Sequence, residues 1–370
     1  MNISQVANDE DCQNNLLNLS DEETLRSSLY SDIEDVFFTR LLPLVEIIGV
    51  LGNLSFIIMV LRVPNMRTVT NGYLLNIAVA DLFFIGYGCT LYIVTYFSSP
   101  IRNDAPFDSW IGCVVSWQPV WLTYFASILL ITLATVEKFY GICYPFQHRL
   151  VTGKTRTFRI IAVSWIVAFV LSSLVVLRYA RLHNICVIYP DEDQYEHYPT
   201  RIQMCLAINT TLLVFSESLT VFPFFMALTV NIYMYARIIY TLSNRSGTDT
   251  SDDSLNNVVI QQRHIRNQVA RLLIINGIIF FCCQLPYRVL SINLFVQEST
   301  GVGFLSSTQY GALAVISRCL VLINSCVNPF VYYASSSSYR QGFSQAFCHL
   351  KNRQLQIDNT NLARLNLREN

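Results

Sequence analysis

The sequence predicts an all-α fold: a bundle of seven transmembrane helices followed by a short amphipathic helix. Of the 370 residues, 52% are hydrophobic and 14% are charged, whereas a soluble domain carries about 25% charged residues. The apolar residues fall in seven separate runs of about 20 residues or more, the length that crosses a bilayer as a helix. None of these runs alternates with a period of two, so a β-barrel is disfavoured.

The seven runs define a predicted membrane domain over residues 37–334. In chain order they cover residues 37–63, 71–97, 111–144, 158–179, 207–242, 269–296 and 306–334. Several of them contain a proline well inside the run, namely Pro119, Pro223, Pro286 and Pro329. In a helix bundle the neighbouring helices satisfy the backbone groups that a proline leaves free, so these runs remain predicted helices.

The segment before the first run, residues 1–36, is polar and acidic, and it predicts a disordered extracellular tail. It does not begin with a basic stretch followed by an apolar one, so no cleavable signal peptide is expected. Asn2 and Asn18 each begin an N-glycosylation sequon, which makes them candidate glycosylation sites.

The segment after the last run predicts an amphipathic helix on the membrane surface, over residues 335–348. Its aromatic residues Tyr339, Phe343 and Phe347 fall on one helical face. Cys348 at its end is a candidate palmitoylation site. Residues 349–370 predict a cytoplasmic tail.

The distribution of basic residues predicts the orientation of the chain. Basic residues are concentrated in the connections after the first, third and fifth runs and after the seventh, and include Arg62, Lys154, Arg245 and Lys351. Basic connections stay in the cytoplasm. The chain is therefore expected in the plasma membrane as a multi-pass protein with an extracellular amino terminus.

Four of the eleven cysteines are expected at or near the outer side: Cys12, Cys113, Cys186 and Cys205. A disulfide between Cys113 and Cys186 would tether the loop before the fifth run to the top of the third. Cys12 and Cys205 are alternative partners, so the sequence leaves the pairing open.

Several polar residues lie well inside the apolar runs, and Asp81 is the costliest because it is ionisable near the middle of the bilayer. One interpretation is a protonated acid that a neighbouring amide satisfies. The other is a cation site, in which Asp81 supplies the charge and Ser127, Asn324 and Ser325 supply oxygen ligands.

The composition argues against several other functions. The formal net charge is zero, so a nucleic-acid partner is not expected. The five histidines lie in loops or tails, so no catalytic or metal-binding constellation is expected in the runs and the chain is not expected to be an enzyme. A seven-helix channel or transporter is the alternative from another class, although the repeated halves typical of transporters are not visible.

Short motifs occur in order, one for each run. They are Gly52-Asn53, 75–81 ("LNIAVAD"), Cys113 with 137–139 ("EKF"), Trp165, Cys186, Pro223, 280–287 ("FFCCQLPY") and 328–332 ("NPFVY"). Together they resemble the landmarks of the rhodopsin-like (class A) G-protein-coupled receptors over nearly the whole membrane domain.

The resemblance implies a receptor that binds a ligand outside and activates a heterotrimeric G protein inside, with arrestin and membrane lipid as further partners. It implies a disulfide between Cys113 and Cys186. It also implies an allosteric sodium pocket, with the metal at Asp81 and with Ser127, Asn324 and Asn328 around it, and no other cofactor.

Individual residues narrow the class of ligand. The last run contains no lysine, which retinal needs for its Schiff base. Val120 stands where amine receptors of the family place an aspartate, so a monoamine is disfavoured. Arg288 and Arg318 bring positive charge to the cavity side. Each either snorkels or pairs with an outer-loop carboxylate, or donates to carboxyl or amide groups of a ligand.

Four segments resemble thyrotropin-releasing-hormone receptors and related invertebrate neuropeptide receptors: residues 65–82, 266–273, 285–288 and 317–329. The resemblance implies peptide contacts at Tyr287, Arg288 and Arg318. The third helix differs from that family and offers Trp121 and Phe125 instead. We therefore expect a neuropeptide with an amide or acidic terminus and a bulky apolar or aromatic group.

The residues that rearrange on activation in this family are present in part. Those that match are Ile128, Pro223, Phe280 and Tyr332. Gln284 stands in place of the usual tryptophan beneath the ligand, and Asn231 stands in place of the usual tyrosine of the fifth helix.

The G-protein-coupling motif is also altered, because the family's acid-arginine-aromatic sequence is Glu137-Lys138-Phe139 here. Lys138 keeps the charge but not the planar donor fork of arginine. It is expected to face Arg266 on the sixth helix, which excludes a salt bridge between these helices. Signalling through phospholipase C is expected from the resemblance, and an atypical or decoy receptor that couples weakly is the alternative.

Overall fold

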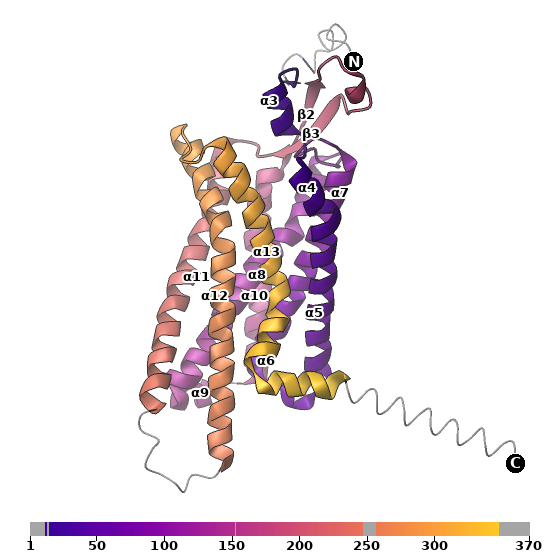
Figure 1. The fold of residues 1–370 in the computed structure, drawn as a ribbon. Coiled ribbons are helices and arrows are strands. Elements are labelled where there is room, and N and C mark those ends of the chain that lie inside the picture. Colours follow the sequence, from indigo (N-terminus) through magenta and orange to yellow (C-terminus); the bar gives the residue numbers. More distant parts are fainter. Residues whose placement is uncertain (1–11, 13–14, 152, 247–256, 348–370) are drawn as a thin grey trace, which may run out of the picture.

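The structure is a computed structural model that describes residue 12 and residues 15–151, 153–246 and 257–347. Within this part, seven helical spans are long and apolar enough to cross a membrane. They are Asp32–Arg62, Val69–Ser98, Trp110–Cys143, Lys154–Tyr179, Thr210–Asn244, Asn267–Thr300 and Gln309–Ser335. They run side by side as a bundle (Figure 1), which confirms the predicted fold class.

The helices of the bundle are α5 (Leu42–Arg62), α6 (Val69–Phe83), α7 (Thr90–Ser98), α8 (Trp110–Cys143), α10 (Lys154–Val175), α11 (Thr210–Ser246), α12 (Asn257–Thr300) and α13 (Ser307–Ser335). α8 packs against α6, α10, α11 and α12, so it is the central helix. Large apolar side chains such as Leu51 and Phe158 remain exposed on the outer helices, as expected where lipid is the solvent.

Two features interrupt the regular helices near the middle of the bundle. Between α6 and α7 the chain forms a π-helical segment, η3 (Phe84–Cys89), so the second span is one continuous but irregular helix. α8, α11, α12 and α13 each contain a proline. Such irregular backbone is tolerated at membrane depth where protein or a cavity surrounds it.

One end of the bundle, here called the sheet end, carries a small sheet (Figure 1). β2 (Arg181–Ile188) pairs antiparallel with β3 (Arg201–Leu206), and β1 (Leu16–Asn18) pairs parallel with β2. Two short helices follow β1, namely α3 (Glu22–Ser28) and α4 (Asp32–Val36). The expectation that the whole of residues 1–36 is disordered is therefore wrong for residues 16–36.

These amino-terminal elements have the local signals of real helices. Asp21 caps α3 by accepting from the backbone N–H of Thr24, and Ser31 and Glu34 form a capping box at the start of α4. Leu19 and Leu25 are buried with Val187 of β2 and Ile202 of β3. These two leucines of the acidic segment are thus covered by side chains of the sheet.

The disulfides of the structure differ from the expected pair. Cys113 pairs with Cys205, and Cys186 pairs with Cys12, so the expected Cys113–Cys186 bond is wrong. The register of the hairpin explains the difference, because Leu182 of β2 lies opposite Cys205. Cys186 lies four residues further along β2, or about 13 Å at the rise of a strand. It therefore lies beside β1, next to the amino-terminal cysteine.

The opposite end of the bundle, here called the loop end, carries α9 (Pro145–Val151) and a helix over residues 337–347 that lies across the bundle (Figure 1). Tyr339 of this last helix is buried and donates its hydroxyl hydrogen to Asn71 Oδ1 on α6. The ring of Phe343 lies 5.8 Å from that of Tyr333. The predicted helix after the last span is present, and Cys348 and residues 349–370 lie outside the described residues.

The disulfide pattern can be tested by peptide mapping of the unreduced protein. We expect one cross-linked peptide pair containing Cys113 and Cys205 and another containing Cys12 and Cys186. As matched variants, Cys113→Ser should leave Cys205 as a free thiol, and Cys12→Ser should leave Cys186 as a free thiol. A cross-linked peptide pair containing Cys113 and Cys186 in the unmodified chain would contradict the pairing.

Candidate ligand-binding cavity

A cavity of about 850 Å³, counting the part open to solvent, lies inside the bundle. Its lining comes from α6, η3, α7, α8, α12, α13 and from η4 (Val176–Tyr179), which follows α10. Aromatic rings make up much of the wall: Phe37, Phe84, Tyr92, Trp117, Trp121, Tyr124, Tyr179, Phe280 and Tyr287. Trp117 and Tyr179 stack at 5.2 Å. The wall is thus apolar and rigid, with polar groups at a few points, as is usual for ligand sites.

Arg288 is one of the two cations that line the cavity, and only 2% of its surface is exposed. Its guanidinium lies 4.5 Å from the ring centre of Tyr124 and 4.7 Å from that of Tyr287. One N–H group donates to the carbonyl of Thr220 at 3.2 Å, and Nε has no partner. The cation is therefore held by aromatic faces and one carbonyl.

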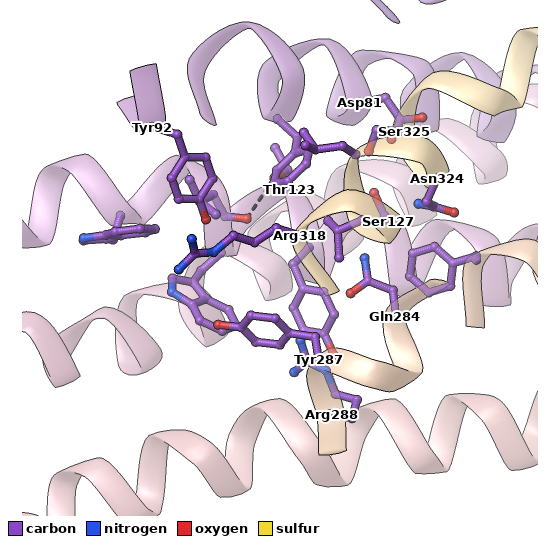
Figure 2. A pocket seen from close by; sticks show the side chains of 18 of the residues that line it. Asp81, Tyr92, Thr123, Ser127, Gln284, Tyr287, Arg288, Arg318, Asn324 and Ser325 are labelled. Atoms are coloured by element: carbon purple, nitrogen blue, oxygen red, sulfur yellow. Dashed lines mark hydrogen bonds between the residues drawn. The ribbon is translucent and has the colours of Figure 1, made fainter. Parts of the chain in front are cut away.

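Arg318 is the second cation, and it comes from the facing helix α13 (Figure 2). Its guanidinium lies 6.0 Å from the ring centre of Tyr92. Among the described residues, neither Arg288 nor Arg318 has a carboxylate within salt-bridge distance. The sequence left open that each arginine pairs with an acid of an outer loop. In the part of the chain that the structure describes, neither arginine does so.

Of the aromatic residues expected to contact the ligand, some line the cavity and one does not. Trp121 and Tyr287 line the cavity, with ring centres 6.3 Å apart. Phe125 does not line it, and its side chain is fully buried in the central apolar cluster. It lies one helical turn below Trp121 on α8 and is covered by neighbouring side chains, so the expected ligand contact at Phe125 is wrong.

Polar residues gather at the deep end of the cavity (Figure 2), where Asp81, Ser127, Asn324 and Ser325 all contribute to the lining. The amide of Asn328 donates to Asp81 Oδ2 at 2.6 Å. Asn324 Oδ1 is buried without a hydrogen-bond partner. A carboxylate, hydroxyls and a spare amide oxygen are the ligands that a hard cation takes, so these residues fit the sodium site that the sequence predicts.

The residues expected to rearrange on activation lie at different places in the bundle. Gln284 and Phe280 line the cavity, and Figure 2 shows Gln284 between the deep polar group and Tyr287. Ile128 belongs to the same buried cluster as Phe280. Tyr332 is fully buried and packs on Phe56 with ring centres 4.8 Å apart.

The sequence analysis missed a buried ion pair near the cavity. Arg178 of η4 pairs with Glu217 of α11, and both side chains are almost completely buried. The pair joins the fourth and fifth spans behind Tyr179, which lines the cavity. Glu217 is an acid within the fifth apolar run and Arg178 ends the fourth, so opposite charges at similar depth were the signal that could have identified it.

At the loop end, Glu137 lies beside His148 of α9, with 2.6 Å between Oε1 and Nε2. Lys138 follows it on α8. Arg266 is within α12, but its side chain lies outside what the structure describes. Tyr235, a second residue that the sequence analysis missed, is buried, and its hydroxyl oxygen accepts a hydrogen bond from Thr135 at 3.2 Å.

Two glycosylation sites were predicted in the amino-terminal segment. Asn18 is exposed on β1, so its glycosylation stays a prediction. Asn2 lies outside the described residues.

The described part of the chain has seven helices long and apolar enough to cross a membrane, and a cavity lies between them. The chain belongs to the rhodopsin family of seven-transmembrane receptors, because the family described as "7 transmembrane receptor (rhodopsin family)" matches residues 52–332. Members of this family are receptors and not enzymes, and the chain is a multi-pass membrane protein.

Individual relatives are neuropeptide receptors. The chain is 25% identical to neuromedin-U receptor 2 of Rattus norvegicus over 84% of this chain and 76% of that protein. It is 26% identical to the thyrotropin-releasing hormone receptor of Gallus gallus, over 82% and 77%. It is 24% identical to the allatostatin-A receptor of Bombyx mori, over 86% and 80%.

The buried ion pair predicts a stability effect. Glu217→Gln should lower the apparent Tm of the detergent-solubilised receptor by several degrees, because removing one partner of a buried pair costs about 3 kcal/mol. Arg26→Gln is the matched control, since it breaks the exposed pair with Glu22 and should change Tm little. An equal Tm for both variants would contradict a structural role for Glu217.

Proposed function

We propose that this protein is a cell-surface receptor that a neuropeptide activates and that couples to a heterotrimeric G protein. The observation that carries the proposal is the pair of cavity arginines, Arg288 and Arg318, which have no carboxylate partner among the described residues. Membership of the rhodopsin family and similarity to receptors named for neuromedin U, thyrotropin-releasing hormone and allatostatin A support it.

In this proposal the sheet end is extracellular, and the ligand enters the cavity from there. Basic residues at the loop end, such as Arg62 and Lys154, support this orientation by the positive-inside rule. The carboxyl or carboxamide oxygens of the peptide accept hydrogen bonds from Arg318 and Arg288. An aromatic or bulky apolar side chain of the peptide packs against Trp121 and Tyr287.

Arginine suits this role because its planar guanidinium offers two parallel donors to one acceptor group. A charged ligand group is favoured in a cavity with two cations and little water, since the local dielectric is low. Binding there would draw α12 and α13 toward a common ligand, because Arg288 and Arg318 belong to these two helices. This movement of α12 and α13 would favour the active arrangement of the bundle.

We propose that a sodium ion is held at the deep end by Asp81 with Ser127, Asn324 and Ser325, while Asn328 orients the carboxylate. A bound cation there would balance the charge of Asp81 and stabilise the arrangement without agonist. Gln284 separates this site from Tyr287, so we propose it as the polar switch between the ligand and the ion.

At the loop end we propose that Lys138 contacts the G protein as a point charge. Glu137 Oε1 lies 2.6 Å from His148 Nε2 on α9, so the acid that precedes Lys138 also contacts the segment that follows α8. Coupling through phospholipase C, and binding of arrestin, are proposed by analogy with the family.

A second candidate function is an atypical receptor that binds its peptide but couples weakly. The substitutions at Lys138, Gln284 and Asn231 favour it. Asn231 donates to Thr132 Oγ1 at 2.9 Å, so it is engaged within the bundle and not positioned to replace the missing tyrosine.

The two functions are separated by a screen of the full-length chain, expressed in cells, against a neuropeptide library with calcium and cyclic AMP readouts. A peptide that raises either signal supports a coupled receptor. Saturable peptide binding with silence in both readouts supports the atypical receptor. Activation by a monoamine, with no peptide active, would contradict both.

The cavity arginines predict a graded loss of potency for the peptide found in that screen. Arg318→Gln should lower its potency roughly 10- to 100-fold, because a hydrogen bond to a charged group contributes about 1.5–3 kcal/mol. Arg318→Lys should recover part of the loss, since the charge remains but the planar fork does not. Arg181→Gln, on the exposed part of β2, is the matched control and should leave potency unchanged.

Lys138 can be tested separately from ligand binding. Lys138→Ala should lower agonist-stimulated nucleotide exchange on the G protein, whereas peptide affinity without G protein should be unchanged. Lys138→Arg should raise exchange, because arginine restores the donor fork. Full exchange by Lys138→Ala would mean that the charge is not used.

A further inference from the structure

The described part of the amino-terminal segment, Cys12 and residues 15–36, is here called the amino-terminal cap. Its first anchor is the sheet: β1 pairs with β2, Leu19 N–H donates to the carbonyl of Ile188 at 2.8 Å, and Cys12 is covalently bonded to Cys186.

The second anchor of the cap is the loop between α7 and α8. Arg102 of this loop pairs with Glu34 of α4 and also donates to the carbonyl of Ser27 at 3.1 Å. Leu29 and Ile101 form an antiparallel bridge. Glu34 is buried, and removing one partner of a buried pair leaves an uncompensated charge. The cap is therefore attached at two places that are far apart in sequence.

The cap also reaches the wall of the ligand cavity. α4 continues through η1 (Phe37–Leu41) into α5, and Phe37 lines the cavity. Tyr30 packs on Phe38 at 5.5 Å and on Tyr96 at 5.0 Å, and Tyr96 donates to Asp35 at 2.8 Å. These contacts fix the last part of the cap against the second span.

The cap lies on the side of the cavity that holds Arg318. Tyr30 and Tyr92 are packed against the same apolar cluster, and Tyr92 lies under the Arg318 guanidinium. Burial raises the pKa of the Tyr30 hydroxyl and the charge of Arg318 opposes that rise, so the two groups share one electrostatic environment. In Figure 1, α3, α4 and the sheet stand over the end of the bundle near α7, away from the ends of α11 and α12.

We propose that the amino-terminal cap holds in place the cavity wall at Phe37, on the Arg318 side, and that the Cys12–Cys186 disulfide and the Arg102–Glu34 ion pair keep this wall closed. A ligand then reaches Arg318 from the side of α11 and α12 and packs against Phe37, and it does not enter between α5 and α7. The inference rests on the proposed function only in taking this cavity as the ligand site.

The test measures access to the cavity with a small, membrane-impermeant, thiol-reactive probe on full-length receptor at the cell surface, so it needs no peptide. Val321→Cys reports on the Arg318 side, because Val321 lines the cavity on α13. Tyr124→Cys reports on the opposite side, beside Arg288. The receptor without a reporter cysteine gives the background from its own free thiols.

The cap is loosened in two independent ways. Cys12→Ser with Cys186→Ser removes the disulfide without leaving a thiol that could pair wrongly. Glu34→Gln removes the ion pair and keeps both disulfides, so it tests the proposal even where the cysteine variant does not reach the surface. The charge-reversed pair, Glu34→Arg with Arg102→Glu, is the matched control that restores attraction.

We expect each loosened cap to speed labelling of Val321→Cys several-fold, to change labelling of Tyr124→Cys little, and to recover slow labelling in the charge-reversed control. Unchanged labelling at Val321→Cys in both loosened receptors would overturn the proposal. An equal rise at both reporters would also overturn it, because that is general loosening and not the opening of one wall. Either failure would leave the proposed peptide receptor untouched.

Discussion

The arrangement of the bundle depends on a small set of hydrogen bonds between polar side chains in its apolar interior. Asn328 on α13 donates to Asp81 on α6, and Asn53 on α5 donates to the carbonyl of Ser325 on α13. An unsatisfied polar group in hydrocarbon costs several kcal/mol, so α5, α6 and α13 are held in one relative register. Since Asp81 and Ser325 also form the floor of the cavity, the depth of the ligand site follows from the same constraint.

The half of the bundle toward the sheet end contains buried charges of two kinds. Arg178 has its carboxylate, Glu217, and together they join two spans. Arg288 has only aromatic faces and a carbonyl around it. Each desolvated cation–π contact contributes about 2 kcal/mol, which offsets part of the several kcal/mol that burying a cation costs. Under the proposed function, an anionic or carbonyl group of the ligand would give Arg288 the kind of partner that Glu217 gives Arg178.

The sequence was sufficient for features that depend on local pattern. The seven spans follow from the length of the apolar runs, and the positions of Arg288, Arg318 and Asp81 around one cavity follow from their depth in those runs. The disulfides could not be obtained in this way, because the choice between Cys186 and Cys205 depends on the register of a hairpin. Phe125 was placed in the cavity because it lies on the same helical face as Trp121, one turn away. Periodicity alone cannot tell that this turn leads from the cavity wall into the packed core.

The amino-terminal segment illustrates a different limit. Its acidic composition resembles that of disordered chains, and its leucines are too few to form a core without β2 and β3. Its order comes from contacts with residues far along the chain, of which Arg102 and Cys186 are the clearest. The composition of the segment therefore did not predict its fold.

The bond between Cys12 and Cys186 has a consequence for biosynthesis. Its two cysteines are separated by 174 residues, which a ribosome adds in about 10–35 s at typical rates of synthesis. During that interval four spans enter the bilayer, and Cys113 emerges as a competing thiol before either correct partner exists. In the orientation proposed above, the lumenal oxidation machinery would have to leave Cys12 reduced, or repair its early pairings, until the hairpin of β2 and β3 is complete. Production of the receptor should thus depend on disulfide isomerase capacity more than that of a relative with a single disulfide.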